Sequence, residues 1–309
     1  MLVVVALGGN ALLRRGEPLD SETQRHNIRS AAAAIAVIAR EHNVVVTHGN
    51  GPQIGLLALQ TQACRAAQPY PLDVLGAESE GMIGYMIEQA LQNQLPRRAV
   101  ATLLTQVVID PRDPAFAKPT KPIGPVYDAR QVARLKSQYG WAMARDGKHW
   151  RRVVASPAPQ RILEIAAIRQ LLRAGVLVIC AGGGGIPVTV TKEHAIWGVE
   201  AVIDKDRSAA LLAKSVGADA LLLLTDVEAV MEGWGTRASR AIKYAPPRAL
   251  RSMDFDPGSM GPKVAAACDF VAAGGKLAAI GALRDAPQLL RGKAGTLVRS
   301  KARKIAYYD

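Results

Sequence analysis

The sequence predicts an α/β fold built on a mainly parallel sheet, and three short segments carry this prediction. Residues 2–7, 44–47 and 176–180 are continuous apolar runs, and each leads directly into glycines. Strands that are buried on both faces of a parallel sheet are apolar along their whole length. Because ligands bind at the carboxyl ends of such strands, we expect the three glycine loops to surround one crevice.

The first strand is joined to the second by a helix. Asp20 or Ser21 together with Gln24 forms a capping-box pattern, which predicts a helix that runs to about Arg40. The order strand, glycine loop, helix, strand, glycine loop is typical of βαβ units with parallel strands.

The loops that follow the three strands indicate phosphate chemistry. They are residues 8–10, residues 49–51 and the four glycines at 182–185. Backbone N–H groups without neighbouring side chains can approach an anion closely, and a helix that begins nearby adds the favourable end of its dipole. No Walker or GxGxxG pattern is present, and a glycine run by itself is equally compatible with a flexible turn.

Two lysines extend the pattern towards the C-terminus. Lys205 stands between Asp204 and Asp206, where it supplies a positioned, movable charge. Lys263 follows Pro262, and proline suits the first turn of a helix. Backbone donors at that helix start and the Lys263 ammonium can therefore share one phosphate.

A proline-rich excursion over residues 110–160 interrupts the strands and helices, with a short helix near 129–138. Its segment 120–125 is stiff and can hold Lys121 over the crevice with little loss of entropy on binding. A solvated loop lysine is the alternative interpretation of this position.

The last third of the chain reads as a regular α/β region. We expect helices over 208–216, about 264–273 and 285–290, strands over 220–224 and 275–281, and a final edge strand over 295–298. Thr225 and Asp226 stand at the carboxyl end of a strand, where a nucleotide can be gripped. The basic tail, residues 301–309, is expected to be a solvated extension.

The composition favours small anionic substrates. The chain has 309 residues, is 49% hydrophobic and carries a formal charge of +13, from 39 basic and 26 acidic residues. It can therefore bury a large core. The basic residues are dispersed and have few aromatic neighbours, which disfavours nucleic acid and favours small phosphorylated ligands.

The cysteines and histidines indicate neither a disulfide framework nor a metal site. Cys64, Cys180 and Cys268 are far apart and odd in number, which favours a reducing cytoplasm. The histidines lack closely spaced ligand partners, and we expect His48 to pack or to bond within its glycine loop. Because no apolar run approaches the roughly 18 residues of a membrane span, a soluble protein without a membrane partner is expected.

Six motifs in order resemble those of carbamate kinases, which are members of the amino acid kinase superfamily. They are LGGNA at 7–11, HGNGPQ at 48–53, TKPIGP at 120–125, GGGGIP at 182–187, GVEAVIDKD at 198–206, and GSM with PK at 258–260 and 262–263. The resemblance extends to about Arg299. It implies a three-layer αβα sandwich in which residues 1–207 bind carbamate or carbamoyl phosphate, residues 208–309 bind the nucleotide, and about 112–160 form a protruding lid.

The resemblance also implies the reaction, in which carbamoyl phosphate and MgADP reversibly give carbamate and MgATP. Phosphoryl transfer through a loose transition state needs mainly alignment and positive charge. Since carbamate is already an oxyanion, we expect no general base. The resemblance further implies Mg²⁺ held mainly by the phosphates, with no separate metal site on the protein, and carbamate that decomposes to ammonia and CO₂.

Residue roles follow from the same resemblance. Lys205 should neutralise the transferring phosphoryl oxygens, Lys263 should contact the β- and γ-phosphates, and Lys121 should reach down from the lid. Asp206 and Asp204 should orient these lysines. Donors to the phosphoryl group are expected from Gly8, Gly9, Asn10, Gly49, Asn50, Gly51, Gly182, Gly183, Gly184 and Gly185, and nucleotide contacts from Thr225, Asp226, Met260 and Lys263.

One departure helps to choose among the superfamily's members. Acetylglutamate kinases and several relatives have a lysine in the first strand, where this chain has Ala6. Carbamate kinases use instead the lysine between two aspartates. Another superfamily kinase with a different carboxylate or phosphate acceptor is the alternative, and a non-catalytic sensor is a third hypothesis that the retained charged residues disfavour.

The resemblance finally implies a homodimer and a role in arginine or purine-derivative breakdown, with ATP formation through the arginine deiminase pathway. The helical stretch 73–94 can supply a dimer surface. Simple core packing of its apolar residues is equally compatible with the sequence.

Overall fold

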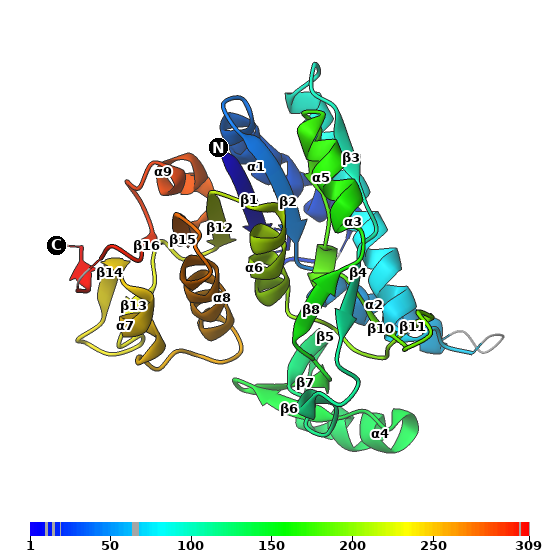
Figure 1. The fold of residues 1–309 in the computed structure, drawn as a ribbon. Helices are drawn as coiled ribbons and strands as arrows, with labels where there is room; N and C mark the ends of the chain where they lie inside the picture. The colour runs from blue at the N-terminus through cyan, green and yellow to red at the C-terminus, as the bar shows by residue number, and fades with distance from the viewer. Residues whose placement is uncertain (10–11, 14–15, 19, 64–67, 303, 309) are drawn as a thin grey trace.

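One large sheet with helices on both faces forms the centre of the molecule (Figure 1). The computed structural model describes residues 1–309 except 10–11, 14–15, 19, 64–67, 303 and 309. Within the described residues the sheet has ten strands in the order β13-β14-β16-β15-β12-β1-β2-β9-β3, with β17 paired to β14. The expected αβα sandwich is confirmed.

The strands and the two helical layers have the following bounds. The sheet contains β1 (Leu2–Leu7), β2 (Asn43–His48), β3 (Val100–Thr102), β9 (Leu177–Ile179), β12 (Ala220–Thr225), β13 (Met231–Glu232), β14 (Arg240–Ala245), β15 (Leu277–Ala282), β16 (Thr296–Val298) and β17 (Ala306–Tyr307). One face packs on α1 (Ser21–Ala39), α3 (Leu72–Gln94) and α9 (Ala286–Leu290). The other packs on α5 (Ile165–Arg173), α6 (Lys205–Val216), α7 (Pro247–Arg251) and α8 (Met260–Ala272).

The central strand β1 shows why the apolar runs become parallel strands. Val4 and Ala6 point into the core beneath α6 and α8, whereas Val3 and Val5 point into the core beneath α1 and α3. Alternate residues of a strand face opposite sides, so both faces require apolar side chains. β1 pairs in parallel with β2 and β12, and β2 with β9, which brings their carboxyl ends to one edge.

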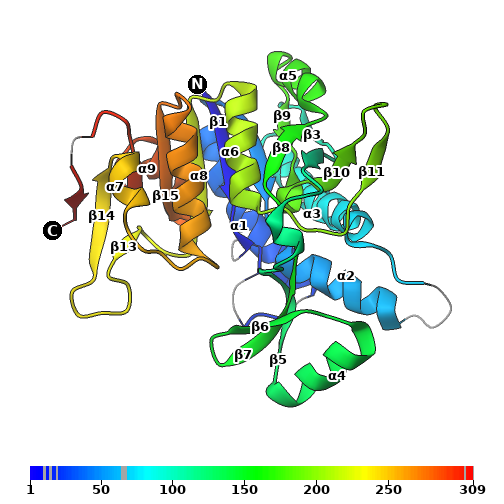
Figure 2. The ribbon, with the colours of Figure 1, turned by 60° about the horizontal axis from the view of Figure 1, so that its bottom comes forward.

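A second sheet and a lid extend from this centre (Figure 2). The second sheet contains β4 (Gln106–Ile109), β8 (Pro159–Ile162), β10 (Ile186–Val190) and β11 (Ile196–Gly198). The lid contains β5 (Lys121–Tyr127), α4 (Ala129–Tyr139), β6 (Met143–Asp146) and β7 (His149–Val154). It rests on α2 (Gly51–Ala63), where a Cβ on Gly55 would lie 1.9 Å from the Gly124 Cα.

Short 3₁₀ turns complete the chain. They are η2 (Pro114–Phe116), η3 (Gly182–Gly184) and η4 (Leu283–Asp285). The expected lobe boundary between residues 207 and 208 falls inside α6. No helix in the described part of the chain is long and apolar enough to cross a bilayer.

Two expectations about the C-terminal region are wrong. β16 is not an edge strand, because it lies between β14 and β15 and runs antiparallel to β15. The tail is not a free extension, because β17 pairs with β14 and the Tyr307 hydroxyl donates to Glu232 at 2.7 Å. A three-residue apolar run reveals a strand but not its neighbours, which are chosen by long-range packing.

Two helices begin earlier than expected. α6 starts at Lys205 because the Asp204 carboxylate accepts from the backbone N–H groups of Asp206 and Arg207 and caps the helix. α8 starts at Met260, which places Pro262 inside its first turn, where its missing N–H is not needed. Both helices thus begin at a motif that carries a candidate lysine.

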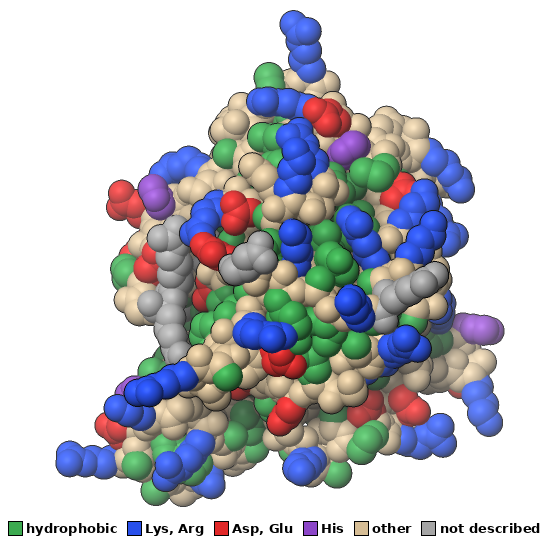
Figure 3. All heavy atoms as spheres, turned by 90° about the vertical axis from the view of Figure 1, so that its left-hand side faces the viewer, with side chains coloured by type: hydrophobic (Ala, Val, Ile, Leu, Met, Phe, Trp, Pro, Cys, Tyr) green, Lys and Arg blue, Asp and Glu red, His purple; other side chains and the backbone are tan. Residues whose placement is uncertain are grey.

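The surface around the C-terminal region carries dispersed charge. Figure 3 shows Lys and Arg side chains distributed over this face around a central hydrophobic area, rather than gathered into one stripe.

Candidate active site

Three lysines from three separate elements meet at two aspartates. The Lys121 Nζ, at the start of lid strand β5, lies 2.5 Å from the Asp204 Oδ2. The Lys205 Nζ lies 2.5 Å from the Asp206 Oδ1, and the Lys263 Nζ lies 3.0 Å from the Asp206 Oδ2. We call these five residues the lysine cluster. Sequence positions more than 140 residues apart are thereby brought into one site.

The lysine cluster is largely buried and has an excess of positive charge. Lys205 and Asp206 are 8% and 4% exposed, and three ammonium groups face two carboxylates. Burial would raise the pKa of Asp206, but Lys205 and Lys263 outweigh it and hold that pKa well below its usual range. Burial lowers the pKa of Lys205, and Asp206 opposes this shift. An anionic phosphoryl group would find compensating charge here.

The glycine loops lie side by side at the same edge of the sheet. A Cβ on Gly49 would lie 3.2 Å from the Gly9 nitrogen, and one on Gly8 would lie 2.8 Å from the Leu224 carbonyl oxygen. Only glycine allows backbones to approach this closely. The expected convergence of these loops is therefore present. Asn10, a further candidate, lies outside the described residues.

The four-glycine loop joins this group from β9. A Cβ on Gly183 would lie 2.1 Å from the Asn50 Nδ2, and one on Gly184 would lie 2.5 Å from the Ile203 carbonyl oxygen. Asn50 precedes α2, which begins at Gly51, and its Nδ2 donates to the Ser79 hydroxyl at 2.8 Å. The loop thus touches both the loop at 49–51 and the segment that leads into the lysine cluster.

Most amides of the four-glycine loop already have partners inside the protein. Gly182 N–H donates to the Glu80 carboxylate at 2.8 Å. Gly184 N–H donates to the Ala181 carbonyl at 3.1 Å, and Gly185 N–H donates to the Gly182 carbonyl at 2.9 Å. The loop therefore offers an anion fewer donors than its sequence indicates, and Gly183 is the amide best suited to contact one.

His48 is buried within its loop, as the sequence predicts. Its Nδ1 lies 3.1 Å from the Gly49 carbonyl oxygen, which can only accept, so Nδ1 carries the proton. Burial lowers the pKa of His48 to about 4. The imidazole is therefore neutral near pH 7.

The residues that we expect to contact the nucleotide lie at the end of β12 and on α8, in the C-terminal half of the chain. Thr225 ends β12, its Cα lies 3.7 Å from the position of a Cβ on Gly8, and its hydroxyl donates to Asp226 at 3.0 Å. Met260 begins α8, the helix that carries Lys263, and packs partly buried against the core. Thr225 thus adjoins the glycine loops, while Met260 shares a helix with the lysine cluster.

The sequence did not reveal the side chains that hold the loops. Glu80 is 1% exposed in the middle of α3 and accepts from the N–H groups of Gly182 and Thr105. The available signal was its spacing, because Glu80 lies three and seven residues before the buried Ile83 and Ile87 on one helical face. A charged residue at such a position requires buried partners.

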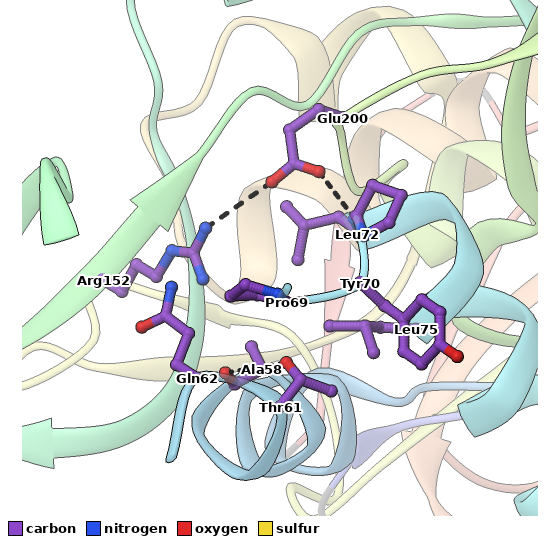
Figure 4. A pocket seen from close by; sticks show the side chains of 10 residues that line it. Ala58, Thr61, Gln62, Pro69, Tyr70, Leu72, Leu75, Arg152 and Glu200 are labelled. Atoms are coloured by element: carbon purple, nitrogen blue, oxygen red, sulfur yellow. Dashed lines mark hydrogen bonds and ion pairs between the residues drawn. The ribbon is translucent and has the colours of Figure 1, made fainter. Parts of the chain in front are cut away.

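A separate cavity of about 260 Å³ lies beside the lid (Figure 4). Arg152 of β7 pairs there with Glu200 at 3.7 Å, and the other Glu200 oxygen accepts from the Leu72 N–H at 2.6 Å. The cavity is lined by Ala58, Thr61, Gln62, Pro69, Tyr70, Pro71, Leu72, Leu75, Arg152 and Glu200. Glu200 ties the lid to the start of α3 and to the segment before Asp204.

The part of the chain that the structure describes contains no group of three His, Cys, Asp or Glu side chains arranged to hold a metal ion. Cys180 and Cys268 are buried free thiols, and Cys64 lies outside the described residues.

Comparison with known proteins places this architecture in a family. The sequence model of the amino acid kinase family matches residues 1–281. Carbamate kinase of Rhizobium meliloti is 57% identical over 311 residues, covering 100% of this chain and 96% of its own, and that of Haemophilus influenzae is 52% identical over 309 residues, covering 100% of both.

Solved structures agree with the sequence relatives. Carbamate kinase from Giardia lamblia bound to AMP-PNP is 41% identical and superposes with a TM-score of 0.88 over 96% of this chain and 98% of its own. The same enzyme bound to citric acid gives a TM-score of 0.91 with the same identity and coverage. The chain is therefore a kinase of the amino acid kinase family and belongs, within that family, to the carbamate kinases.

Proposed function

We propose that the protein transfers a phosphoryl group reversibly between carbamoyl phosphate and MgADP, giving carbamate and MgATP. The observation that carries this proposal is the meeting of Lys121, Lys205 and Lys263 at two aspartates, beside three glycine loops. Carbamate kinases at 57% and 52% identity over the whole chain support the choice of substrate. Released carbamate decomposes to ammonia and CO₂.

The lysines supply the charge that phosphoryl transfer requires. We assign Lys205 to the oxygens of the moving phosphoryl group, Lys263 to the β- and γ-phosphates, and Lys121 to the same group from the lid. Ammonium groups fixed before the reaction stabilise the transition state without reorganising. Asp204 and Asp206 hold them through charge-assisted hydrogen bonds and so set their orientation.

The loops supply donors and close approach. We assign Gly9 and Gly51, with Asn10 and Asn50, as donors to the phosphoryl and carbamoyl groups, and within the run 182–185 we assign the direct contact to Gly183. The N–H groups of Gly8 and Gly49 already donate to the carbonyls of Leu224 and Leu7 at 3.0 and 3.1 Å, so we assign these two glycines to close approach of the backbone. The start of α2 at Gly51 adds the positive end of a helix dipole. The remaining glycines of the run let neighbouring backbone and side chains approach the loop closely.

The reaction needs no general base. Carbamate already carries the negative oxygen that attacks phosphorus, so no proton has to be removed. The buried His48, with its Nδ1 bonded to Gly49 and its pKa lowered to about 4, is consistent with this proposal.

The nucleotide enters as its magnesium complex. Mg²⁺ prefers phosphate oxygens, water and one or two carboxylates. Asp204 and Asp206 already face ammonium groups, so we propose that the phosphates hold the ion and that it screens their charge when bound. We assign residues 208–309 to nucleotide binding, with Thr225, Asp226, Met260 and Lys263 as contacts, and the AMP-PNP complex of the Giardia enzyme supports a nucleotide substrate.

The test is an ATP assay with purified protein. Carbamoyl phosphate and MgADP should yield ATP, measured by luciferase, while in the reverse direction acetylglutamate, aspartate and UMP should not consume MgATP. Efficient phosphorylation of one of those acceptors, with no ATP from carbamoyl phosphate, would favour another kinase of the same superfamily.

We further propose a cytoplasmic homodimer that forms ATP late in arginine breakdown, through the arginine deiminase pathway. Adenine nucleotides are available in the cytoplasm. On α3 the apolar side chains of Val74, Met82 and Tyr85 are exposed, and they offer a surface that a second copy would cover.

A further inference from the structure

A buried carboxylate holds the four-glycine loop from behind. Glu80 is 1% exposed, although it lies in the middle of α3 among apolar residues. Its Oε1 accepts from the Gly182 N–H at 2.8 Å, and its Oε2 accepts from the Thr105 N–H at 3.2 Å. Burying a carboxyl group is costly unless its hydrogen bonds repay the loss of water. Core packing alone therefore does not explain why a glutamate occupies this buried position.

The backbone that Glu80 holds is in an unusual conformation. Ala181 has a φ of 52°, in the left-handed region that residues with a side chain rarely adopt. The Ala181 N–H donates to the Thr105 hydroxyl at 2.9 Å, and the Ala181 carbonyl accepts from the Thr47 hydroxyl at 2.7 Å. Such strain persists only where surrounding contacts fix it.

The loop has almost no room to shift sideways. A Cβ on Gly182 would lie 2.4 Å from the His48 Nε2 and 2.9 Å from the Glu80 Cγ. On the other side, the Gly184 carbonyl accepts from the Ser208 hydroxyl at 2.6 Å, one turn after Lys205 in α6. A movement of the loop would therefore reach the helix that carries Lys205.

We propose that Glu80 is a positioning residue for phosphoryl transfer, which fixes the Gly182 amide directly and the Ala181 turn through Thr105, so that the loop fits the reacting group. This inference rests on the proposed function. Glu80 itself contacts no reacting atom. It acts through the Gly182 N–H and through the Thr105 backbone, whose hydroxyl holds Ala181.

The surroundings of Glu80 make its protonation sensitive to pH. The titratable groups that face it are His48 from β2, Cys180 after β9 and Glu164 before α5, and none of them is a cation near pH 7. Burial raises the pKa of Glu80 to about 8, and the N–H groups of Gly182 and Thr105 oppose this shift. A protonated carboxyl has a hydroxyl that donates, so it holds two N–H groups less well than a carboxylate does.

The first test compares Glu80→Gln with Glu164→Gln. Glu164 is a matched control, because it accepts from the Gln106 N–H at 2.8 Å without touching the four-glycine loop. We expect Glu80→Gln to lower kcat by roughly 10- to 100-fold, as misplaced reacting groups do, with the KM for MgADP changed less than about twofold. A rise of kcat between pH 7 and 9 should be present in the wild type and absent in Glu80→Gln. In Glu164→Gln the rise should remain but move to lower pH, because the Glu164 charge helps to raise the pKa of Glu80.

A second test separates positioning from folding and from the proposed function. Amide hydrogen exchange at Gly182 and Thr105 should speed up in Glu80→Gln, and Thr47→Val should lower kcat in the same way while removing only a hydroxyl. These exchange rates do not depend on turnover. A wild-type protein that makes no ATP would therefore refute the proposed function, while the exchange rates would still test whether Glu80 holds the loop. Wild-type kcat, pH profile and exchange rates in Glu80→Gln would overturn the role of Glu80.

Discussion

Lys205 and Asp206 are neighbours in sequence, yet their charged groups form a buried pair at 2.5 Å. A buried ion pair contributes little net stability, because desolvation offsets the Coulomb attraction. The Lys205–Asp206 pair instead orients the ammonium groups, since Asp206 also binds the Lys263 Nζ at 3.0 Å. One carboxylate therefore fixes two ammonium groups from different helices.

Replacement of Lys205 should affect catalysis far more than replacement of a lysine outside the lysine cluster. By analogy with the loss of one preorganised transition-state donor, Lys205→Ala should lower turnover by on the order of 10²- to 10³-fold. Lys214→Ala, at an exposed position of the same helix, is the control and should keep wild-type turnover. A loss below about fivefold in Lys205→Ala, measured in the ATP assay, would refute the assigned role.

Glu80 should make the protein less stable as pH rises. Its pKa in the folded protein is raised to about 8, above the unfolded value, so its contribution is fully present below about 4.5 and is lost as pH rises towards 8. His48 acts in the opposite sense below its unfolded pKa of about 6.5, where the unfolded chain binds the proton.

Between pH 6.5 and 8 the protonation of Glu80 should therefore change the free energy of unfolding more than the protonation of His48 does. We expect the free energy of unfolding to fall by up to about 1.4 kcal/mol per pH unit in this window. Urea unfolding at pH 6.5, 7.5 and 8.5 measures it. The decline should disappear in Glu80→Gln, and an unchanged slope in that variant would show that other groups cause it.

The sequence alone could predict those strands and helices whose pattern of apolar residues lies within the element itself. β1, β2 and β12 were recognisable because strands buried on both faces are uniformly apolar, and α3 was recognisable from its spacing. The neighbours of β16, the pairing of β17 and the partners of Glu80 depend on residues far away in sequence. No local pattern encodes such contacts.

The contact between α2 and the lid can be tested with one methyl group. Gly55→Ala would place a Cβ 1.9 Å from the Gly124 Cα, which must then move. We expect Gly55→Ala to destabilise the protein by about 1–3 kcal/mol, as overpacking does. The new Cβ of Gly76→Ala in α3 would have no atom of another described element within 4 Å, so this variant should be neutral or stabilising, by up to about 1 kcal/mol.

Chemical denaturation of both glycine variants measures this difference. If Gly55→Ala is as stable as Gly76→Ala, the lid does not rest on α2 as closely as described. Because Lys121 begins the same strand as Gly124, an additional loss of turnover in Gly55→Ala would link this contact to the site.

At the scale of the whole molecule, we propose that exposed apolar side chains of α3 form the dimer surface. Met82 and Tyr85 are 39% and 55% exposed on α3. We expect light scattering of the wild type to give twice the chain mass of 32.8 kDa, and Met82→Lys to weaken the dimer by placing a charge in its interface. Val126→Lys, at an exposed apolar position of the lid, is the control and should remain dimeric. A wild-type mass of one chain would contradict the proposal.

A crystal structure with MgADP and aluminium fluoride, which mimics the phosphoryl group in transfer, would show directly whether the three lysines share one phosphoryl group. We predict that the Nζ atoms of Lys121, Lys205 and Lys263 each lie within about 3 Å of a fluoride or phosphate oxygen of that one assembly. A structure in which the mimic binds elsewhere, while the three lysines remain on Asp204 and Asp206 alone, would contradict it.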